Sequence, residues 1–101
     1  MASYELSPEA FEDLLRIQDF ISSDNPHAAE QTIDKFFSAF EHLVQWPQSG
    51  HSRPDLTSKE VLFWPIDSYL IVYRVRENES LIQIVAVLHA ARDVPAILDD
   101  R

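Results

Sequence analysis

Cysteine is absent from the 101 residues, glycine occurs once, and eight basic side chains stand against 17 acidic ones. Without cysteine the chain can form no disulfide, thiol nucleophile or cysteine-based zinc site, and it fits the reducing cytosol. No apolar run reaches the ~20 residues of a membrane-spanning helix. The N-terminus also lacks the basic and apolar segments of a secretory signal. We therefore expect a cytoplasmic protein with no membrane-spanning segment.

Basic side chains are scarce in the first half of the sequence. Residues 1–45 carry nine acidic and two basic side chains, whereas residues 46–101 carry eight acidic and six basic ones. A strongly acidic body disfavours general binding to phosphate backbones, because that affinity rests on Lys and Arg. Within residues 53–92 the two signs are balanced, five against five, so the sequence still allows a local basic cluster there.

The chain does contain a stretch rich in β-branched and aromatic residues, between Val61 and Asp93. Three runs have the composition of strands: Val61–Trp64, closed by Pro65, then Tyr69–Val75 and Leu81–Leu88. Polar residues 77–80 predict a turn between the last two runs. The third run is apolar on both faces except for Gln83, which favours a central position in a sheet.

Two helices are predicted before these strands. Ser7-Pro8 and Asn25-Pro26 each combine a capping side chain with a proline at the first helical position. The first helix should end near Ser22 and the second near Gln45. Their expected buried stripes are Phe11, Leu14, Leu15, Phe20 and Ile21, and then Ala29, Ile33, Phe36, Phe37, Phe40, Leu43 and Val44. Four charged residues should lie largely outside the first stripe: Glu12, Asp13, Arg16 and Asp19.

The remaining segments complete an α+β fold. Ala2–Leu6 is expected to be an edge strand, Trp46–Lys59 an irregular loop, and Val94–Leu98 a short helix or tail. The element order is thus β-α-α-β-β-β. Only the sheet offers an apolar surface large enough to cover the helices. We therefore expect one domain over residues 1–101, with an N-terminal helical hairpin on a small, mainly antiparallel sheet.

Short motifs in this order resemble the RelE/ParE toxin superfamily of bacterial type II toxin–antitoxin systems, and most of all its ParE branch. They are Leu6-Ser7-Pro8-Glu9-Ala10, Asn25-Pro26-His27-Ala28-Ala29, Pro47-Gln48-Ser49-Gly50, Arg53-Pro54-Asp55-Leu56, Tyr69-Leu70-Ile71-Val72-Tyr73-Arg74-Val75 and Leu88-His89-Ala90-Ala91-Arg92-Asp93. The resemblance covers almost the whole chain. It implies a plasmid-stabilisation type of module and a cognate antitoxin, ParD-like and of the ribbon–helix–helix class, whose C-terminal segment wraps the toxin. It implies no metal or other cofactor.

The superfamily implies two different activities. ParE-like members inhibit DNA gyrase, and RelE-like members cleave messenger RNA on the ribosome. Cleavage needs a base for the 2′-hydroxyl, an acid for the leaving oxygen and cations for the phosphorane charge. Arg74, His89 and Arg92 are the candidates for these roles. Leu70, however, stands where the RelE type carries an arginine, and no tyrosine follows Tyr73.

Five residues are candidates for binding the target or the antitoxin, and the four arginines among them each have a structural alternative. They are Arg53, Arg74, Arg76, Arg92 and Asp93. Arg53 fits a target contact or a loop ion pair with Asp55. Arg74 and Arg76 fit a partner-binding edge or the solvated end of a strand. Arg92 fits a contact with a partner anion or an ion pair that ties down the C-terminal segment.

His89, Trp46 and Trp64 also have two interpretations each. His89 fits a general base or a packed, hydrogen-bonded histidine at a strand end, and no histidine spacing indicates a zinc site. Both tryptophans border apolar runs, so we favour packing in the core or at its rim over exposed anchors for a partner. If the last two strands are neighbours, Arg74, Arg76, His89 and Arg92 should gather along one edge of the sheet.

Three functions follow from this pattern. The leading interpretation is a ParE-like toxin that inhibits gyrase by binding it. The alternatives are a RelE-like ribosome-dependent endoribonuclease and a non-toxic relic that keeps only its antitoxin. In each case we expect the antitoxin tail near Arg74, Arg76 and Arg92 and over the apolar groove of the hairpin, held mainly by hydrophobic anchors.

Overall fold

The computed structural model describes residues 3–101, and its elements confirm the predicted order. They are β1 (Ser3–Leu6), α1 (Pro8–Ser22), α2 (Pro26–Gln45), β2 (Leu62–Ile66), β3 (Tyr69–Arg76), the 3-10 turn η1 (Glu77–Glu79), β4 (Leu81–His89) and α3 (Val94–Asp99). The predicted caps are present: Ser7 Oγ accepts from Ala10 N–H, and Asn25 Oδ1 accepts from Ala28 N–H. Ala2 of the predicted first strand lies outside the described residues.

The four strands form one mixed sheet in the order β1-β4-β3-β2. β1 pairs parallel with β4, and the other two pairings are antiparallel, so the central place of β4 and the edge place of β1 are confirmed. The predicted end of β2 at Pro65 is wrong, because the strand begins at Leu62 and continues to Ile66. β2 lies at the edge of the sheet, where a proline without an N–H costs no ladder hydrogen bond.

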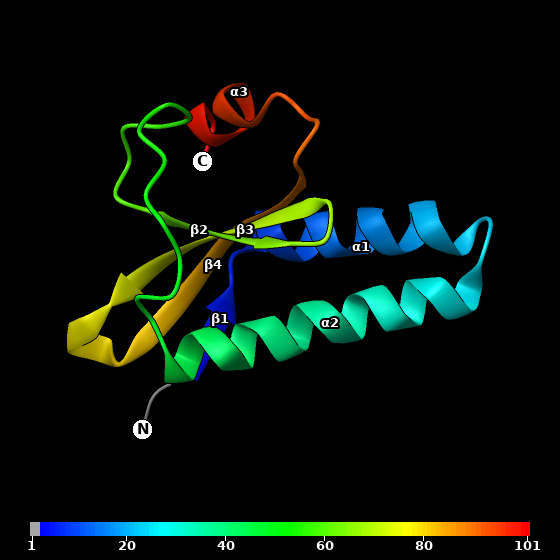
Figure 1. Cartoon of the computed structure of the whole chain (residues 1–101), viewed down its shortest axis with the longest axis horizontal. Helices are drawn as coiled ribbons and strands as arrows, with labels where there is room; N and C mark the ends of the chain where they lie inside the picture. Colours follow the sequence, from blue (N-terminus) through cyan, green and yellow to red (C-terminus); the bar gives the residue numbers. More distant parts are fainter. Residues whose placement is uncertain (1–2) are drawn as a thin grey trace.

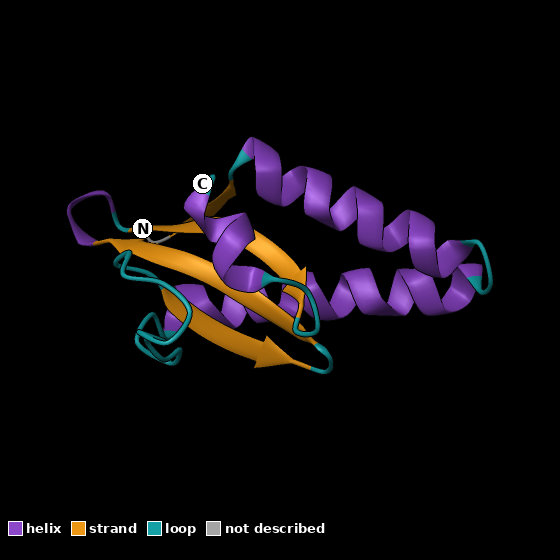
Figure 2. Cartoon of the chain, turned by 90° about the horizontal axis from the view of Figure 1, so that it is seen from above, coloured by secondary structure: helices purple, strands orange, loops and turns teal. Residues whose placement is uncertain are grey.

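The sheet lies between two layers (Figures 1 and 2). The α1–α2 hairpin packs on one face, and its connected ends project past the sheet. The loop of residues 46–61 starts at the end of α2 and crosses to the other face, where α3 also lies. β3 contributes to both cores, since Ile71 and Tyr73 belong to the hairpin-side core and Leu70 and Val72 to the opposite one.

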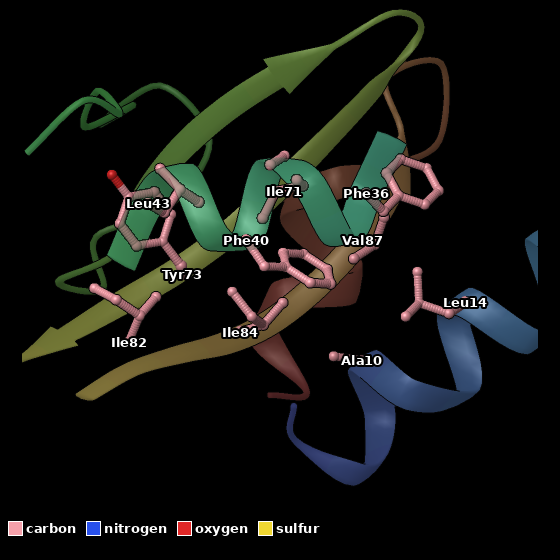
Figure 3. Close-up of a cluster of buried hydrophobic side chains, with 11 residues drawn as sticks. Ala10, Leu14, Phe36, Phe40, Leu43, Ile71, Tyr73, Ile82, Ile84 and Val87 are labelled. Atoms are coloured by element: carbon pink, nitrogen blue, oxygen red, sulfur yellow. The ribbon is translucent and has the colours of Figure 1, made fainter. Parts of the chain in front are cut away.

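The hairpin-side core is built mainly by α2 and the two central strands. Figure 3 shows the buried side chains of Phe36, Phe40 and Leu43 against Ile71, Tyr73, Ile82, Ile84 and Val87. Phe37 was also expected in this core, but it is exposed and only its ring edge meets Phe40. A helix of this pitch turns residue 37 about 100° from residue 36, which takes it off the face that meets the sheet.

The predicted stripe of α1 is wrong in its orientation. Phe11, Leu15 and Phe20 are exposed, and Ala10, Asp13 and Leu14 are buried. Ser7 explains this orientation, because its N–H donates to the Ile84 carbonyl and its hydroxyl to the Val85 carbonyl, which docks the start of α1 on β4. The face that then meets the sheet follows the i, i+3, i+4, i+7 spacing of Ala10, Asp13, Leu14 and Ile17.

Candidate functional site

The candidate residues from the ends of β3 and β4 do not form one cluster. In the antiparallel ladder Arg76 lies opposite Leu81, and His89 lies opposite Tyr69. Arg74 and Arg76 are therefore at one end of the ladder, and His89 and Arg92 are at the other. The seven residue steps between Tyr69 and Arg76 correspond to roughly 24 Å. The predicted single polar edge is wrong, because antiparallel neighbours end at opposite sides of the sheet.

Two of the candidates, Arg53 and Arg74, line a cleft of about 490 Å³ beneath the loop of residues 46–61. The Arg53 guanidinium makes a two-point contact with Asp55, at 3.0 and 2.8 Å, so the predicted loop ion pair is confirmed. The hydrogen bond from Arg53 holds the pKa of the Asp55 carboxyl below its usual value. Lys59 lines the same cleft, and its Nζ donates to the Leu98 carbonyl at 2.6 Å, which ties the loop to α3.

Arg74 and Arg76 lie beside each other on the face opposite the hairpin. Both guanidinium groups donate to Oε1 of Gln83, at 3.3 and 3.2 Å. Arg76 also lies 3.9 Å from a Glu79 carboxylate oxygen, with both side chains solvated. Gln83 therefore positions these two cations near the turn η1, where β3 and β4 are connected.

His89 and Arg92 line a second depression of about 360 Å³, between α1 and the end of β4. We call it the edge groove. Its other lining residues are Asp13, Arg16, Ile17, Phe20, Tyr69 and Val87. The groove thus combines an apolar floor with two guanidinium groups and an imidazole. Neither Arg74 nor Arg76 reaches it, so the three candidate nuclease residues are divided between two surfaces.

The surroundings of His89 confirm the structural interpretation made from the sequence. Its Nδ1 accepts a hydrogen bond from Ala91 N–H at 3.0 Å, and its ring packs edge-on against Tyr69. Because Nδ1 is an acceptor, the neutral ring carries its proton on Nε2. The neutral His89 ring therefore offers one side-chain donor, the Nε2–H.

The ion pair that ties down the C-terminal segment is not made by Arg92. No ion pair with the Arg92 guanidinium is found among residues 3–101. Arg101 takes that role instead, with its guanidinium 2.6 and 2.9 Å from the two carboxylate oxygens of Asp13. Asp93 caps α3, its carboxylate accepting from Ala96 N–H at 3.3 Å.

Sequence reasoning missed Asp13, which is 1% exposed on α1. Besides the pair with Arg101, its Oδ2 accepts from Val87 N–H at 3.0 Å, and Arg16 lies 3.4 Å from Oδ1. The hydrogen bonds that Arg101 donates to the Asp13 carboxylate raise the pKa of Arg101. Asp13 follows Ala10 by three positions and precedes Leu14, so helical spacing alone could have placed it on the buried face. The prediction instead followed the larger apolar side chains of Phe11 and Leu15.

The two tryptophans behave differently. Trp64 is partly buried and stacks on His42 with ring centroids 5.1 Å apart, and His42 in turn contacts Ser49. Trp46 is 62% exposed, so its predicted packing is wrong. Trp46 is the C-cap of α2, so it follows the last helical residue, Gln45.

Two general features of the described residues bear on function. Residues 3–101 hold no group of three or more His, Asp or Glu side chains arranged to bind a metal ion. No helix in this part of the chain is long and apolar enough to cross a membrane.

Comparison with known proteins assigns the family. Residues 4–94 match the model described as "ParE toxin of type II toxin-antitoxin system, parDE". The chain belongs to this family. The match begins in β1 and ends at the start of α3, so it includes both the cleft and the edge groove.

Named relatives and a solved structure agree with the family. Toxin RelE2 of Caulobacter vibrioides is 32% identical over 92 residues, which cover 91% of this chain and 99% of the relative. Toxin RelE3 of the same organism is 28% identical over 81% of this chain and 89% of its own length. The chromosomal ParDE system from P. aeruginosa contains a chain that superposes with a TM-score of 0.71 at 22% identity, covering 88% of this chain and 96% of that one. This last likeness supports the fold.

Proposed function

We propose that this protein is the toxin of a type II toxin–antitoxin module and that it acts in the cytoplasm by binding DNA gyrase, without cleaving a substrate. The observation that carries the proposal is the ParE family match over residues 4–94. The division of Arg74 from His89 and Arg92 supports it, because these three candidate nuclease residues lie on two surfaces and cannot act together on one phosphate.

A supercoiling assay tests the proposal directly. Purified protein is added in increasing excess to gyrase, ATP and relaxed plasmid, and supercoiled product is measured with and without the protein. We expect supercoiling to fall with increasing protein. Unchanged supercoiling at high excess, together with arrest of a translation extract, would exclude gyrase as the target.

A second candidate function is ribosome-dependent cleavage of messenger RNA, because two relatives carry RelE names. Primer extension on translating ribosomes separates it from the first. New 5′ ends that appear only with the protein favour cleavage. Because Arg74 and His89 lie at opposite ends of the β3–β4 ladder, we expect only one of the variants Arg74→Ala and His89→Ala to lose these 5′ ends.

The acidic composition leaves a third candidate, a non-toxic relic that retains antitoxin binding. Induced expression without the antitoxin distinguishes it from both others. If growth stops on induction and recovers when the neighbouring antitoxin gene is co-expressed, the result supports a working toxin. Unchanged growth, with the protein present at measurable levels, supports the relic.

The proposed partner is a ParD-like, ribbon–helix–helix antitoxin. Exposed apolar side chains on the hairpin offer it anchors: Phe11 and Leu15 share one face of α1 at i, i+4 spacing. Hydrophobic burial of such side chains supplies most of the affinity, and charge affects mainly the association rate. Arg74 and Arg92 lie at opposite ends of the sheet, so an antitoxin that contacts both has to cross it.

A further inference from the structure

The edge groove differs from the rest of the hairpin in its charge. The sequence carries nine acidic and two basic side chains in residues 1–45, yet the groove has one carboxylate, Asp13, and that carboxylate is already bound by Arg101. Arg16 makes only a 3.4 Å contact with this occupied carboxylate, and Arg92 has no ion pair within residues 3–101. Two cations in an acidic protein therefore face the same small space without a full partner.

Apart from the Tyr69 hydroxyl, which can both donate and accept, the polar side-chain groups left over in the groove are donors. Arg16 and Arg92 donate through their guanidinium groups, and the neutral His89 ring donates through Nε2 because Nδ1 is occupied by Ala91 N–H. A carboxylate matches this set, since it accepts several hydrogen bonds and pairs with guanidinium at two points. The lining of Ile17, Phe20, Tyr69 and Val87 favours an apolar neighbour next to that carboxylate.

The backbone of β4 adds two further groups. Ala90 N–H donates to Ser68 on the β3 side, so the alternation of a strand turns the backbone groups of Val87 and His89 to the opposite side. β1 ends opposite Ile84 and covers neither residue. Val87 N–H is bound by Asp13, and the His89 carbonyl accepts from Arg92 N–H. The Val87 carbonyl and the His89 N–H remain, and no hydrogen bond to either is found in the described part of the chain.

An acceptor and a donor two residues apart on a strand edge match the backbone of an extended segment. Such a segment carries free N–H and C=O groups, whereas a helix uses its own within the helix. We propose that the edge groove holds an extended segment of the cognate antitoxin, with an Asp or Glu side chain between Arg16 and Arg92. The segment bonds to the Val87 carbonyl and the His89 N–H. This inference rests on the proposed partnership with an antitoxin.

Amide exchange in the complex tests the backbone contact. The full chain, labelled with ¹⁵N, is co-expressed with the antitoxin from the adjacent reading frame, and exchange of the His89 amide is measured in free and bound protein. We expect exchange to slow at least about tenfold on binding. A complex that forms while the His89 amide exchanges at its free rate overturns the placement and leaves the antitoxin partnership standing. Failure to form any complex removes both.

Side-chain variants test the carboxylate. Arg16→Gln and Arg92→Gln each remove one groove cation, and Lys35→Gln removes an exposed charge from α2 as the matched control. We expect each groove variant to weaken antitoxin binding about tenfold and the control to stay within twofold. The loss of antitoxin affinity in the double variant should be smaller than the product of the two single fold-losses, because both cations bind one carboxylate. Equal affinity of all variants, or a bound antitoxin segment whose amides show helical protection, overturns the proposal.

Discussion

Gly50 and Tyr73 are in direct contact, with the Gly50 N–H donating to the Tyr73 hydroxyl at 2.8 Å. The same hydroxyl donates to the Pro47 carbonyl at 2.8 Å. A β-carbon at position 50 would lie 2.6 Å from the Tyr73 oxygen and 2.9 Å from the Phe63 carbonyl oxygen. The single glycine of the chain is thus required by close packing, at the point where the loop of residues 46–61 meets the sheet.

Gly50→Ala should therefore destabilise the protein, by ~1–3 kcal/mol for overpacking of a well-packed site. The measurement is urea unfolding followed by circular dichroism. Ser52→Ala, in the same loop at an exposed position, is the control and should lie within about 0.5 kcal/mol of the unmodified protein. Equal urea midpoints for the two variants would mean that the loop accommodates the added β-carbon without loss of stability.

Alkaline pH should also weaken the attachment of this loop. Burial raises the pKa of the Tyr73 hydroxyl above its usual value near 10, and the hydrogen bond from Gly50 opposes this in part. A raised folded-state pKa means that the contribution is complete below pH ~10 and is lost as the pH rises through the folded-state pKa. Unfolding curves between pH 9 and 12 should therefore converge for the unmodified protein and Tyr73→Phe. A constant difference across that range would contradict the assignment.

Loss of the Asp13–Arg101 pair should cost more than loss of a surface charge. Asp13→Asn leaves Arg101, which is 14% exposed at its side chain, without its carboxylate, and breaking a buried pair typically costs ~3–5 kcal/mol. We expect a value near the lower end, since Arg101 keeps a bond to the Val85 carbonyl. Asp19→Asn, on the exposed face of α1, is the matched control. Denaturant midpoints measure both, and a similar small shift would show that the pair adds little.

Antitoxin binding should depend only modestly on salt. Apolar anchors such as Phe11 and Leu15 supply most of the affinity, and exposed ion pairs are each worth ~0–1 kcal/mol. Dissociation constants of the toxin and an antitoxin tail peptide are measured across a salt series, with Arg74→Ala and Arg92→Ala alongside. A steep salt dependence would make charge the main source of affinity. No loss in either variant would place the tail away from both ends of the sheet.

Local chemistry made much of the fold predictable. The first residues of α1 and α2 follow from Ser7-Pro8 and Asn25-Pro26, whose N-capping hydrogen bonds join residues three positions apart. The strands follow from runs of β-branched residues, and the central place of β4 follows from its two apolar faces. In each case the cause lies within a few residues of the feature it determines.

The site was less predictable because its contacts join distant parts of the chain. Asp13 and Arg101 are 88 positions apart, and nothing near either residue indicates the other. The expected cluster of Arg74, Arg76, His89 and Arg92 failed for a geometrical reason, since the ends of antiparallel neighbours point in opposite directions. The expected position of Arg16 outside the buried stripe is confirmed, since its side chain is 59% exposed, but its place beside the edge groove depends on how α1 is rotated on β4.

The parallel pairing of β1 with β4 affects how the protein is made. Ser3 lies opposite Leu81, so the first strand finds its place only after nearly the entire sequence has been synthesised. Until then the helices have no complete sheet to cover, and their apolar face stays accessible to other molecules. Long-range pairing of this kind slows folding. A nascent chain on the ribosome consequently lacks its completed sheet until β4 has been synthesised and has paired with β1.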